Sequence, residues 1–393
     1  MASRIPILPC RTLRRHLRLP ITLPALTQTR PISAFGYEQA KALVFSKHGD
    51  PPNEVLKLHT HSISPAHSNL LTIRFLAAPI NPADINQIQG VYPSKPVFTT
   101  GLGTAEPVAV GGNEGVAEVI SVGDKVSSLK RGDWVIMRSP SFGTWRTHAQ
   151  TSEDQLLKID KTGITPVQAG TVSVNPITAW RMLKDFVSLQ EGDWFIQNGA
   201  NSAVGMAAIQ LAKTWGYKSI NVVRDRTHGL DELKQKLKDL GATEVITDTE
   251  LKDVDFKSRV KKWTQGNPIK LGLNCVGGNQ AFTMAKSLGD DAHFVTYGAM
   301  SKKPFSLPAG LLIFKNIRFD GFWVSRWGAQ NPEEKAQTVQ NVLELYKQGK
   351  FELGPLNEIP WDWETKEKDL VDAVSGTFQD YRPGKGIFVF GKT

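Results

Sequence analysis

The sequence predicts an α/β chain in which a mostly antiparallel β domain precedes a doubly wound parallel sheet. Three observations lead to this fold class. Short apolar segments broken by glycine and proline fill residues 41–159, which is typical of a compact β domain. From Asn175 onward, apolar strands alternate with helical patterns, as in parallel sheets that are covered by helices. A glycine-containing turn joins the first of these strands to the first helix.

The β domain is expected from segments that are rich in β-branched and apolar residues and that end at turn-forming residues. These segments are 42–45, 70–75, 115–120 and 134–137. Their spacing, with glycine and proline between them, predicts a compact domain of mostly antiparallel strands.

The second part is expected to form six strands in βα alternation. The strands are 194–197, 219–223, 244–247, 270–274, 293–297 and 317–321. The helices between them are 202–215, 230–240, 256–264 and 280–288. This alternation predicts a doubly wound parallel sheet.

Glycines mark the ends of three of these helices. Gly216, Gly241 and Gly289 each follow a helical pattern, at the position where a left-handed glycine ends a helix. One more helix is expected over 332–349, and the apolar tail 387–390 is expected to return as a strand to the first domain. We therefore expect a leader over 1–36, a catalytic domain over 37–174 and 331–393, and a nucleotide-binding domain over 175–330.

The turn between Gly199 and Gly205 is the first candidate functional feature. It follows an apolar strand and opens a helix, which places backbone N–H groups and a helix N-terminus where a pyrophosphate can bind. The residues of this cradle would be Asn201, Ser202, Ala203 and Val204. The turn lacks the G-x-G-x-x-G pattern. The strand before it and the helix after it nevertheless favour a cofactor site over an ordinary βα turn.

The end of the next strand indicates which cofactor is bound. There, Arg224 and Arg226 flank Asp225. In NAD enzymes an acidic residue near this point binds the ribose 2′-hydroxyl, whereas arginine accommodates a 2′-phosphate. The pattern predicts NADPH in preference to NADH, with a solvated charge pair as the alternative.

The positive charge of the chain is concentrated at its N-terminus. The 393 residues carry a formal net charge of +9, but six arginines precede the first acidic residue, Glu38. They are Arg4, Arg11, Arg14, Arg15, Arg18 and Arg30. An acid-free segment rich in arginine, leucine, serine and threonine is typical of a mitochondrial transit peptide, so we expect a mitochondrial matrix protein. The remainder is only mildly basic, which does not indicate a nucleic-acid partner.

Two further features of composition limit the function classes. The chain has two cysteines, Cys10 and Cys275, too few for a disulfide framework or a four-thiolate zinc cluster. No apolar run is long enough to span a bilayer, so we expect no membrane insertion.

Several segments together indicate a known family. They are INPADIN (80–86), GGNEG (111–115), GTWRT (143–147), VNP (174–176), TAWRML (178–183), NVVRDR (221–226), LNCVGG (273–278), VTYG (295–298) and GFW (321–323). With this domain order, the chain resembles the medium-chain dehydrogenase/reductases and, among them, the mitochondrial trans-2-enoyl-thioester reductases. The resemblance implies a GroES-like β domain with a Rossmann domain, and a homodimer.

The resemblance also bears on metal binding. Zinc alcohol dehydrogenases of this superfamily carry a cysteine and a histidine where this chain has Asn81 and Asn113. Asparagine does not replace thiolate or imidazole as a zinc ligand. We therefore expect no catalytic metal.

Without a metal, a side chain or water must deliver the proton that completes reduction. The resemblance assigns this role to Tyr92, since a phenol with an ordinary pKa of about 10 stays protonated at neutral pH. Taken alone, a loop tyrosine is more often a packing residue.

The resemblance assigns cofactor contacts to further residues. Asn175 would lie at the nicotinamide end, although it could also cap the helix that follows it. Lys385, otherwise a surface lysine, would touch the cofactor. The remaining contacts would come from the ends of two strands, at the carboxyl edge where such sheets bind ligands. They are Tyr297, Gly298, Ala299, Met300, Phe322, Trp323 and Val324, for which core packing or a dimer contact is the alternative.

Two features near the site are expected to be structural. Cys275 lies on an apolar strand and is expected to be a buried thiol. Lys302, Lys303 and Arg326 flank the cleft and are expected to form a solvated basic rim rather than a carrier-protein contact.

The sequence thus predicts NADPH-dependent reduction of a trans-2-enoyl thioester on acyl carrier protein or CoA. Hydride would pass to the β-carbon, and Tyr92 would supply the α-proton directly or through water. The alternatives are a zinc-free quinone or alkenal reductase of the same superfamily, and a nucleotide- or RNA-binding relative without activity.

Overall fold

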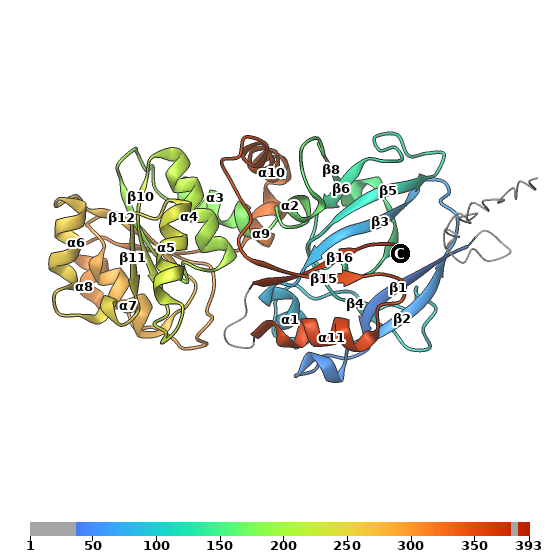
Figure 1. Ribbon diagram of the computed structural model, residues 1–393, viewed down its shortest axis with the longest axis horizontal. Coiled ribbons are helices and arrows are strands. Elements are labelled where there is room, and N and C mark those ends of the chain that lie inside the picture. The colour runs from blue at the N-terminus through green and yellow to red at the C-terminus, as the bar shows by residue number, and fades with distance from the viewer. Residues whose placement is uncertain (1–36, 379–383) are drawn as a thin grey trace, which may run out of the picture.

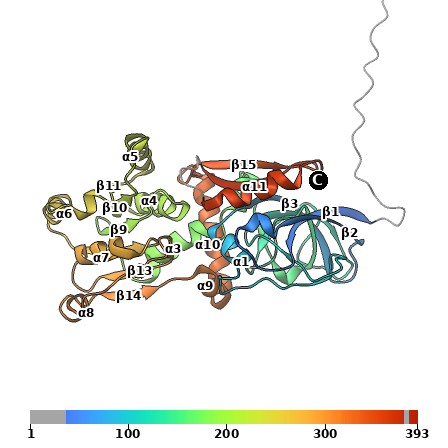
Figure 2. The same ribbon diagram turned by 90° about the horizontal axis from the view of Figure 1, so that it is seen from below.

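The computed structural model describes residues 37–378 and 384–393. The expected leader, residues 1–36, and Cys10 lie outside the described residues. The described strands form three sheets. Figures 1 and 2 both place helix α10 (Pro332–Lys347) between a parallel sheet on one side and the β-rich part on the other.

The β-rich part contains a seven-stranded and a three-stranded sheet. The larger has the order β15-β16-β3-β5-β6-β8, with β7 also paired to β3, and the smaller has the order β2-β1-β4. Their bounds are β1 Glu38–Phe45, β2 Lys57–Ile63, β3 Leu70–Pro79, β4 Ala109–Val110, β5 Val116–Val122, β6 Trp134–Met137, β7 His148–Ser152, β8 Leu156–Ile159, β15 Leu356–Trp361 and β16 Lys385–Phe390. Strand β16 pairs antiparallel with β3, so the C-terminal tail returns to this sheet. Its other neighbour, β15, runs parallel to it.

The parallel sheet has six strands in the order β11-β10-β9-β12-β13-β14. They are β9 Trp194–Asn198, β10 Lys218–Val223, β11 Glu244–Thr247, β12 Ile269–Asn274, β13 His293–Thr296 and β14 Arg318–Gly321. All neighbouring pairs are parallel. The sheet's chain order moves outward from β9 in both directions, which defines a doubly wound sheet.

Alternate residues of these strands pack against helices on opposite faces. Ile196 of β9 packs in a cluster with Phe256 and Met284 of two helices on one face. Phe195, its neighbour, packs with Leu211 and Met182 of two others. Period-two alternation of apolar residues toward both faces is expected where helices cover both. The helices are α3 Asn175–Asp185, α4 Ala203–Trp215, α5 Leu230–Leu240, α6 Phe256–Thr264, α7 Gly278–Ser287 and α8 Ala309–Ile313.

The remaining helices are short or connect the two parts. They are α1 Pro82–Ile88, α2 Pro166–Gly170, α9 Val324–Gln330 and α11 Glu367–Ser375, with 3₁₀ turns at Pro52–Glu54, Glu153–Gln155, Glu250–Lys252 and Gly376–Phe378.

Two predictions about helix ends are wrong. Gly216 and Gly241 end their helices in the left-handed conformation, but helix α7 ends at Ser287 and Leu288 is extended. Gly289 instead donates its N–H to the Ile269 carbonyl at 3.0 Å, and an added Cβ would lie 2.4 Å from Pro268. Its role is therefore close packing against the start of β12. Asn175 does not cap a helix either, because it lies in the first turn of α3 and the cap is Val174.

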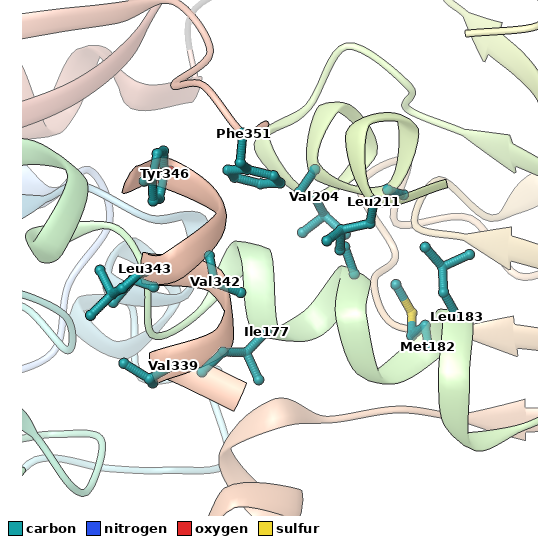
Figure 3. Close-up of a cluster of buried hydrophobic side chains, with 14 of the residues drawn as sticks. Ile177, Met182, Leu183, Val204, Leu211, Val339, Val342, Leu343, Tyr346 and Phe351 are labelled. Atoms are coloured by element: carbon teal, nitrogen blue, oxygen red, sulfur yellow. The ribbon is translucent and has the colours of Figure 1, made fainter. Parts of the chain in front are cut away.

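A single buried cluster joins the two parts of the molecule. Figure 3 shows Ile177 of α3 beside Val339 and Val342 of α10, and Val204 of α4 beside Phe351, which follows α10. The same cluster reaches Ala77 of β3. Burial of apolar side chains contributes about 25 cal/mol per Å², so this continuous core fixes how the two parts meet. Within the described residues, no helix has the length and apolar character needed to cross a membrane.

Candidate active site

Tyr92 lies on a loop whose path is set by helix α1. The carboxylate of Asp84 accepts the Asn81 backbone N–H at 2.7 Å, which stabilises the first turn. Gly90, two residues past the end of α1, has φ +77°, and an added Cβ would lie 2.9 Å from His48. This close approach requires glycine and turns the chain back. The N–H of Tyr92 then donates to the Asn86 carbonyl at 3.1 Å, which holds the tyrosine at the helix end.

Tyr92 meets Trp323 from the other part of the molecule. The indole Nε1 of Trp323 donates to Tyr92 Oη at 2.8 Å, and the two rings meet edge to face with centroids 5.9 Å apart. Burial raises the pKa of Tyr92 above its usual value of 10.0, opposed by hydrogen bonds from Trp323 and Ser325. The phenol is therefore protonated at neutral pH and can act as a proton donor.

A buried polar cluster lies beneath this loop. Asn113 Nδ2 donates to Asp84 Oδ1 at 2.6 Å and to Gln87 Oε1 at 2.7 Å. The N–H of Ser141 donates to Asn113 Oδ1 at 2.7 Å. Burial raises the pKa of Asp84 from 3.8 to about 6, against the hydrogen bonds from Asn81 and Asn113. The described residues include no group of three or more His, Cys, Asp and Glu side chains placed to hold a metal ion.

Asn81 is the centre of a second set of contacts in this cluster. Its Nδ2 donates to Glu114 Oε2 at 3.0 Å, and its Oδ1 accepts from Lys385 Nζ at 2.6 Å and from Asn175 Nδ2 at 3.3 Å. Asn81 and Glu114 are 4% and 0% exposed. Two predicted cofactor residues, Asn175 and Lys385, thus meet at one amide oxygen.

The acidic members of this cluster were not predicted from the sequence. Asp84 and Glu114 fall in segments that carry the family resemblance, but neither was predicted as a site residue. The available signal was an asparagine close to each carboxylate, Asn81 three residues before Asp84 and Asn113 directly before Glu114, because buried polar groups require partners.

The glycine-containing turn lies between β9 and α4 as expected. Ser202 is the N-cap of α4, and its Oγ accepts the N–H of Gly205 at 3.1 Å. Ala203 and Val204 form the first turn, where helical N–H groups have no intrahelical partner. Gly199 has φ +59°, and an added Cβ would lie 2.5 Å from Cys275 Sγ. The turn therefore presents N–H donors at the carboxyl edge of the sheet, suited to an anion.

Arg224, Asp225 and Arg226 follow the end of β10 directly. The N–H of Asp225 donates to Asp248 Oδ1 at 2.8 Å, and Asp225 Oδ1 accepts the N–H of Arg226 at 2.9 Å. The Asp225 carboxylate is thus used within its own loop. Two guanidinium groups beside this loop suit a phosphate.

The segment after β13 brings a buried hydroxyl to the same edge. Tyr297 Oη is buried and makes no hydrogen bond of ordinary geometry among the described residues, with the side chains of Cys275 and Ser202 as its polar neighbours. Burial, followed by the adjacent Cys275 thiol, raises the pKa of Tyr297 well above its usual value. Gly298 packs against Cys275, and Ala299 and Met300 are exposed. An orphaned donor beside an anion-binding turn fits a dinucleotide.

The residues after β14 divide between core and site. Phe322 is buried, and its ring packs against Phe186 and Trp327. Trp323 is 36% exposed and faces Tyr92, and Val324 begins α9.

Cys275 is buried, directly after β12 rather than within it. Lys302, Lys303 and Arg326 are exposed.

Comparisons with known proteins identify the family. Residues 67–176 match the alcohol dehydrogenase GroES-like domain, and residues 203–347 match the zinc-binding dehydrogenase family. The mitochondrial enoyl-[acyl-carrier-protein] reductase of Yarrowia lipolytica is 49% identical over 331 residues, which cover 84% of this chain and 86% of that protein. The chain belongs to the mitochondrial enoyl-[acyl-carrier-protein] reductases.

Two solved structures of enoyl thioester reductases are similar throughout. The Etr1p/NADP/crotonyl-CoA complex has a TM-score of 0.85 and 41% identity, over 89% of this chain and 99% of that chain. The Etr1p/Etr2p heterodimer from Candida tropicalis has a TM-score of 0.84 and 42% identity, with the same coverage. The predicted reductase family and its GroES-like plus Rossmann architecture are therefore confirmed.

Proposed function

We propose that this enoyl-[acyl-carrier-protein] reductase reduces trans-2-enoyl thioesters with NADPH in mitochondria. The observation that carries the proposal is the Trp323–Tyr92 hydrogen bond, which holds a protonated phenol opposite the nucleotide-binding edge. The similarity to an enzyme bound to NADP and crotonyl-CoA supports the same cofactor and substrate class here.

NADPH, when bound, would supply a hydride to the β-carbon of the enoyl chain. Tyr92 would deliver the proton that the α-carbon requires, directly or through water. Because Trp323 N–H donates to Tyr92 Oη, the phenol oxygen accepts that bond and its own proton remains available for transfer. Burial raises the pKa of Tyr92, so the phenol keeps this proton until it is transferred to the substrate.

The cofactor contacts are assigned to the carboxyl edge of the parallel sheet. The pyrophosphate would be held by Asn201, Ser202, Ala203 and Val204. The 2′-phosphate would be bound by Arg224 and Arg226, with Asp225 between them. Asn175 would bind the nicotinamide end, near Lys385. The hydroxyl of Tyr297 would donate a hydrogen bond to the cofactor. The remaining cofactor contacts along this edge would come from Gly298, Ala299, Met300, Phe322, Trp323 and Val324.

The domain assignment follows from these contacts. Residues 175–330 would bind NADPH, and residues 37–174 with 331–393 would form the catalytic domain. Strands β15 and β16 support this division, because they belong to the seven-stranded sheet. Residues 1–36 would form the mitochondrial transit peptide, and the thioester would be carried by acyl carrier protein or CoA.

We also propose a homodimer built on strand β14. This strand is last in the order of the parallel sheet, so one of its edges pairs with no other described strand. Nearby, Ile313 and Phe314 are 69% and 84% exposed. The heterodimeric relative supports a dimer of this kind, and a second copy of this chain would cover both the edge and the apolar residues.

The reaction is tested by following the loss of NADPH absorbance with trans-2-hexenoyl-CoA and, separately, with a simple quinone. Selective turnover of the thioester is expected. Turnover of the quinone alone would assign the chain to the quinone reductases, and turnover of neither would reject the enzymatic proposal.

A further inference from the structure

The amide of Asn81 lies between a group that can only accept hydrogen bonds and a group that can only donate them. Its Nδ2 faces the carboxylate of Glu114 at 3.0 Å, and its Oδ1 faces the ammonium of Lys385 at 2.6 Å. A carboxylate has no proton to donate and an ammonium has no lone pair to offer. The Asn81 amide therefore has one allowed orientation, since turning it over would oppose like groups on both sides.

The orientation of the Asn81 amide determines the orientation of the Asn175 amide. The oxygen that Asn81 presents to Lys385 also accepts Asn175 Nδ2 at 3.3 Å. Asn175 must use its N–H₂ group there, so its Oδ1 points away from Asn81. No described residue donates to that oxygen. Asn175 thus offers an acceptor on its outer side.

Glu114 also fixes the segment that carries Asn175. Its Oε1 accepts the backbone N–H of Val174 at 2.9 Å and Ser173 Oγ at 3.3 Å. Val174 is the N-cap of α3, and Asn175 is its first residue. One carboxylate therefore sets both the backbone position of Asn175 and, through Asn81, the direction of its amide.

We propose that Glu114, Asn81 and Lys385 are positioning residues that orient Asn175 so that its Oδ1 accepts the carboxamide N–H₂ of the nicotinamide. The proposal rests on the assignment of Asn175 to the nicotinamide end. An acceptor aimed at this group selects a carboxamide and holds the ring with one face toward the substrate. Glu114 and Lys385 each contact Asn81, so they would act on the position of the ring only through Asn81 and Asn175.

The surrounding charges support a protonated Lys385. Burial lowers the pKa of Lys385 below its usual value, and the carboxylates of Glu114 and Asp84 oppose this effect. Both carboxylates lie within the same cluster, so removing the proton from Lys385 would take away a positive charge that they face. Lys335 on α10 also faces Glu114 electrostatically, but its Nζ is bonded to the carbonyl of Arg138 at 2.5 Å.

The test compares the Kd of NADPH with the Kd of its reduced 3-acetylpyridine analogue, measured by titration calorimetry on the full-length protein. The analogue has a methyl group where NADPH has the N–H₂ group, so it leaves an acceptor unpaired. Wild type is expected to bind NADPH about tenfold more tightly than the analogue. Asn175→Leu, which removes the acceptor, should bring the ratio of the two Kd values close to one.

The two positioning variants are Lys385→Met, which removes the ammonium that donates to the shared oxygen, and Asn81→Leu, which removes that oxygen. Each should lower the ratio toward that of Asn175→Leu, because Asn175 is then free to turn its N–H₂ group outward. Lys335→Met is the matched control, since it removes another partly exposed lysine without touching Asn81. It should keep the wild-type ratio. The Kd ratio of a variant is compared with that of wild type only if calorimetry shows that the variant binds NADPH at one site per chain.

Three results would overturn the proposal, and they separate it from its premise. If Asn175→Leu loses the preference while Lys385→Met and Asn81→Leu keep it, Asn175 binds the carboxamide but is not oriented by this chain of contacts. If wild type shows no preference, the assignment of Asn175 is wrong as well. If wild type does not bind NADPH, the proposed function itself fails.

Discussion

The indole N–H of Trp323 and the hydroxyl of Tyr92 are joined by a hydrogen bond of 2.8 Å across 231 residues of sequence. Tyr92 follows α1 in the β-rich part, and Trp323 follows the last strand of the parallel sheet. The contact therefore links the proposed proton donor to the edge where the nucleotide would bind. Because an aromatic edge and a hydrogen bond act together, the phenol is held in one orientation.

Tyr92→Phe should lower kcat by about 100-fold, the lower part of the range for general acid catalysis. The variant keeps the ring that packs on Trp323 but has no proton to give. The Kd of NADPH should not change, because Tyr92 is assigned no cofactor contact. Steady-state rates with trans-2-hexenoyl-CoA and a separate NADPH titration measure the two effects. Full activity in this variant would remove Tyr92 from the mechanism.

Replacing both Arg224 and Arg226 by alanine should raise the KM for NADPH by about 100-fold and change the KM for NADH little. Each charge-assisted hydrogen bond to the 2′-phosphate contributes about 1.5–3 kcal/mol, and NADH lacks that phosphate. Arg131→Ala, which removes an exposed arginine from another loop, controls for the loss of charge. Equal effects on the two cofactors would contradict the assignment.

The sequence predicted the parallel sheet better than the β-rich part. Strands β9 and β12 are buried over nearly their whole length because helices cover both faces of the sheet. Strand β2 was not predicted, since only His61 and Ile63 of its residues are buried. Strand β15, which contains Pro360, was missed for the same reason: its residues are mostly exposed.

The site divides in the same way between local and long-range information. The turn at Ser202 could be predicted because a strand, a turn and a helix follow one another in the chain. The contact of Lys385 with Asn81 joins residues 304 apart, and no local pattern records such a contact. Asn175 was expected either at the nicotinamide end or as a helix cap, but it lies in the first turn of α3, where the proline that follows it is tolerated.

Gly199→Ala should destabilise the protein in a way that depends on Cys275. Gly199 has φ +59°, and its added Cβ would lie 2.5 Å from Cys275 Sγ. The left-handed backbone costs an alanine about 1–2 kcal/mol, and overpacking adds about 1–3 kcal/mol. Cys275→Ala removes the sulfur. In that background, Gly199→Ala should therefore cost only the free energy of the left-handed backbone. A double-mutant cycle on the free energy of unfolding measures the coupling, and strictly additive values would exclude the steric contact.

Phe314→Ser should convert the proposed homodimer to monomers. The side chain is 84% exposed at the end of α8, and a polar group at a desolvated interface costs binding free energy without a partner. Val254→Ser is the matched control, because Val254 is fully exposed in another loop, just before α6. Sedimentation equilibrium measures the mass of each protein. A monomeric wild type, or a dimer that survives Phe314→Ser, would reject this interface.

His61→Gln should make the protein more resistant to acid. Burial, with a smaller effect of the Arg146 guanidinium, lowers the pKa of His61 from 6.5 to about 4. Between these values the unfolded chain binds a proton that the folded chain does not, so wild-type stability falls as pH falls from 6.5 to 4. The difference corresponds to about 3 kcal/mol over the whole window.

The free energy of unfolding, from urea titrations above pH 6.5 and at steps down to 4, tests this prediction. The gain of His61→Gln over wild type should be constant above the window and should grow as the pH falls within it. Asp84, whose pKa is raised to about 6, titrates in both proteins and cancels in the difference. A gain that does not vary with pH would mean that folding leaves the proton affinity of His61 unchanged, and its burial would then carry no electrostatic cost.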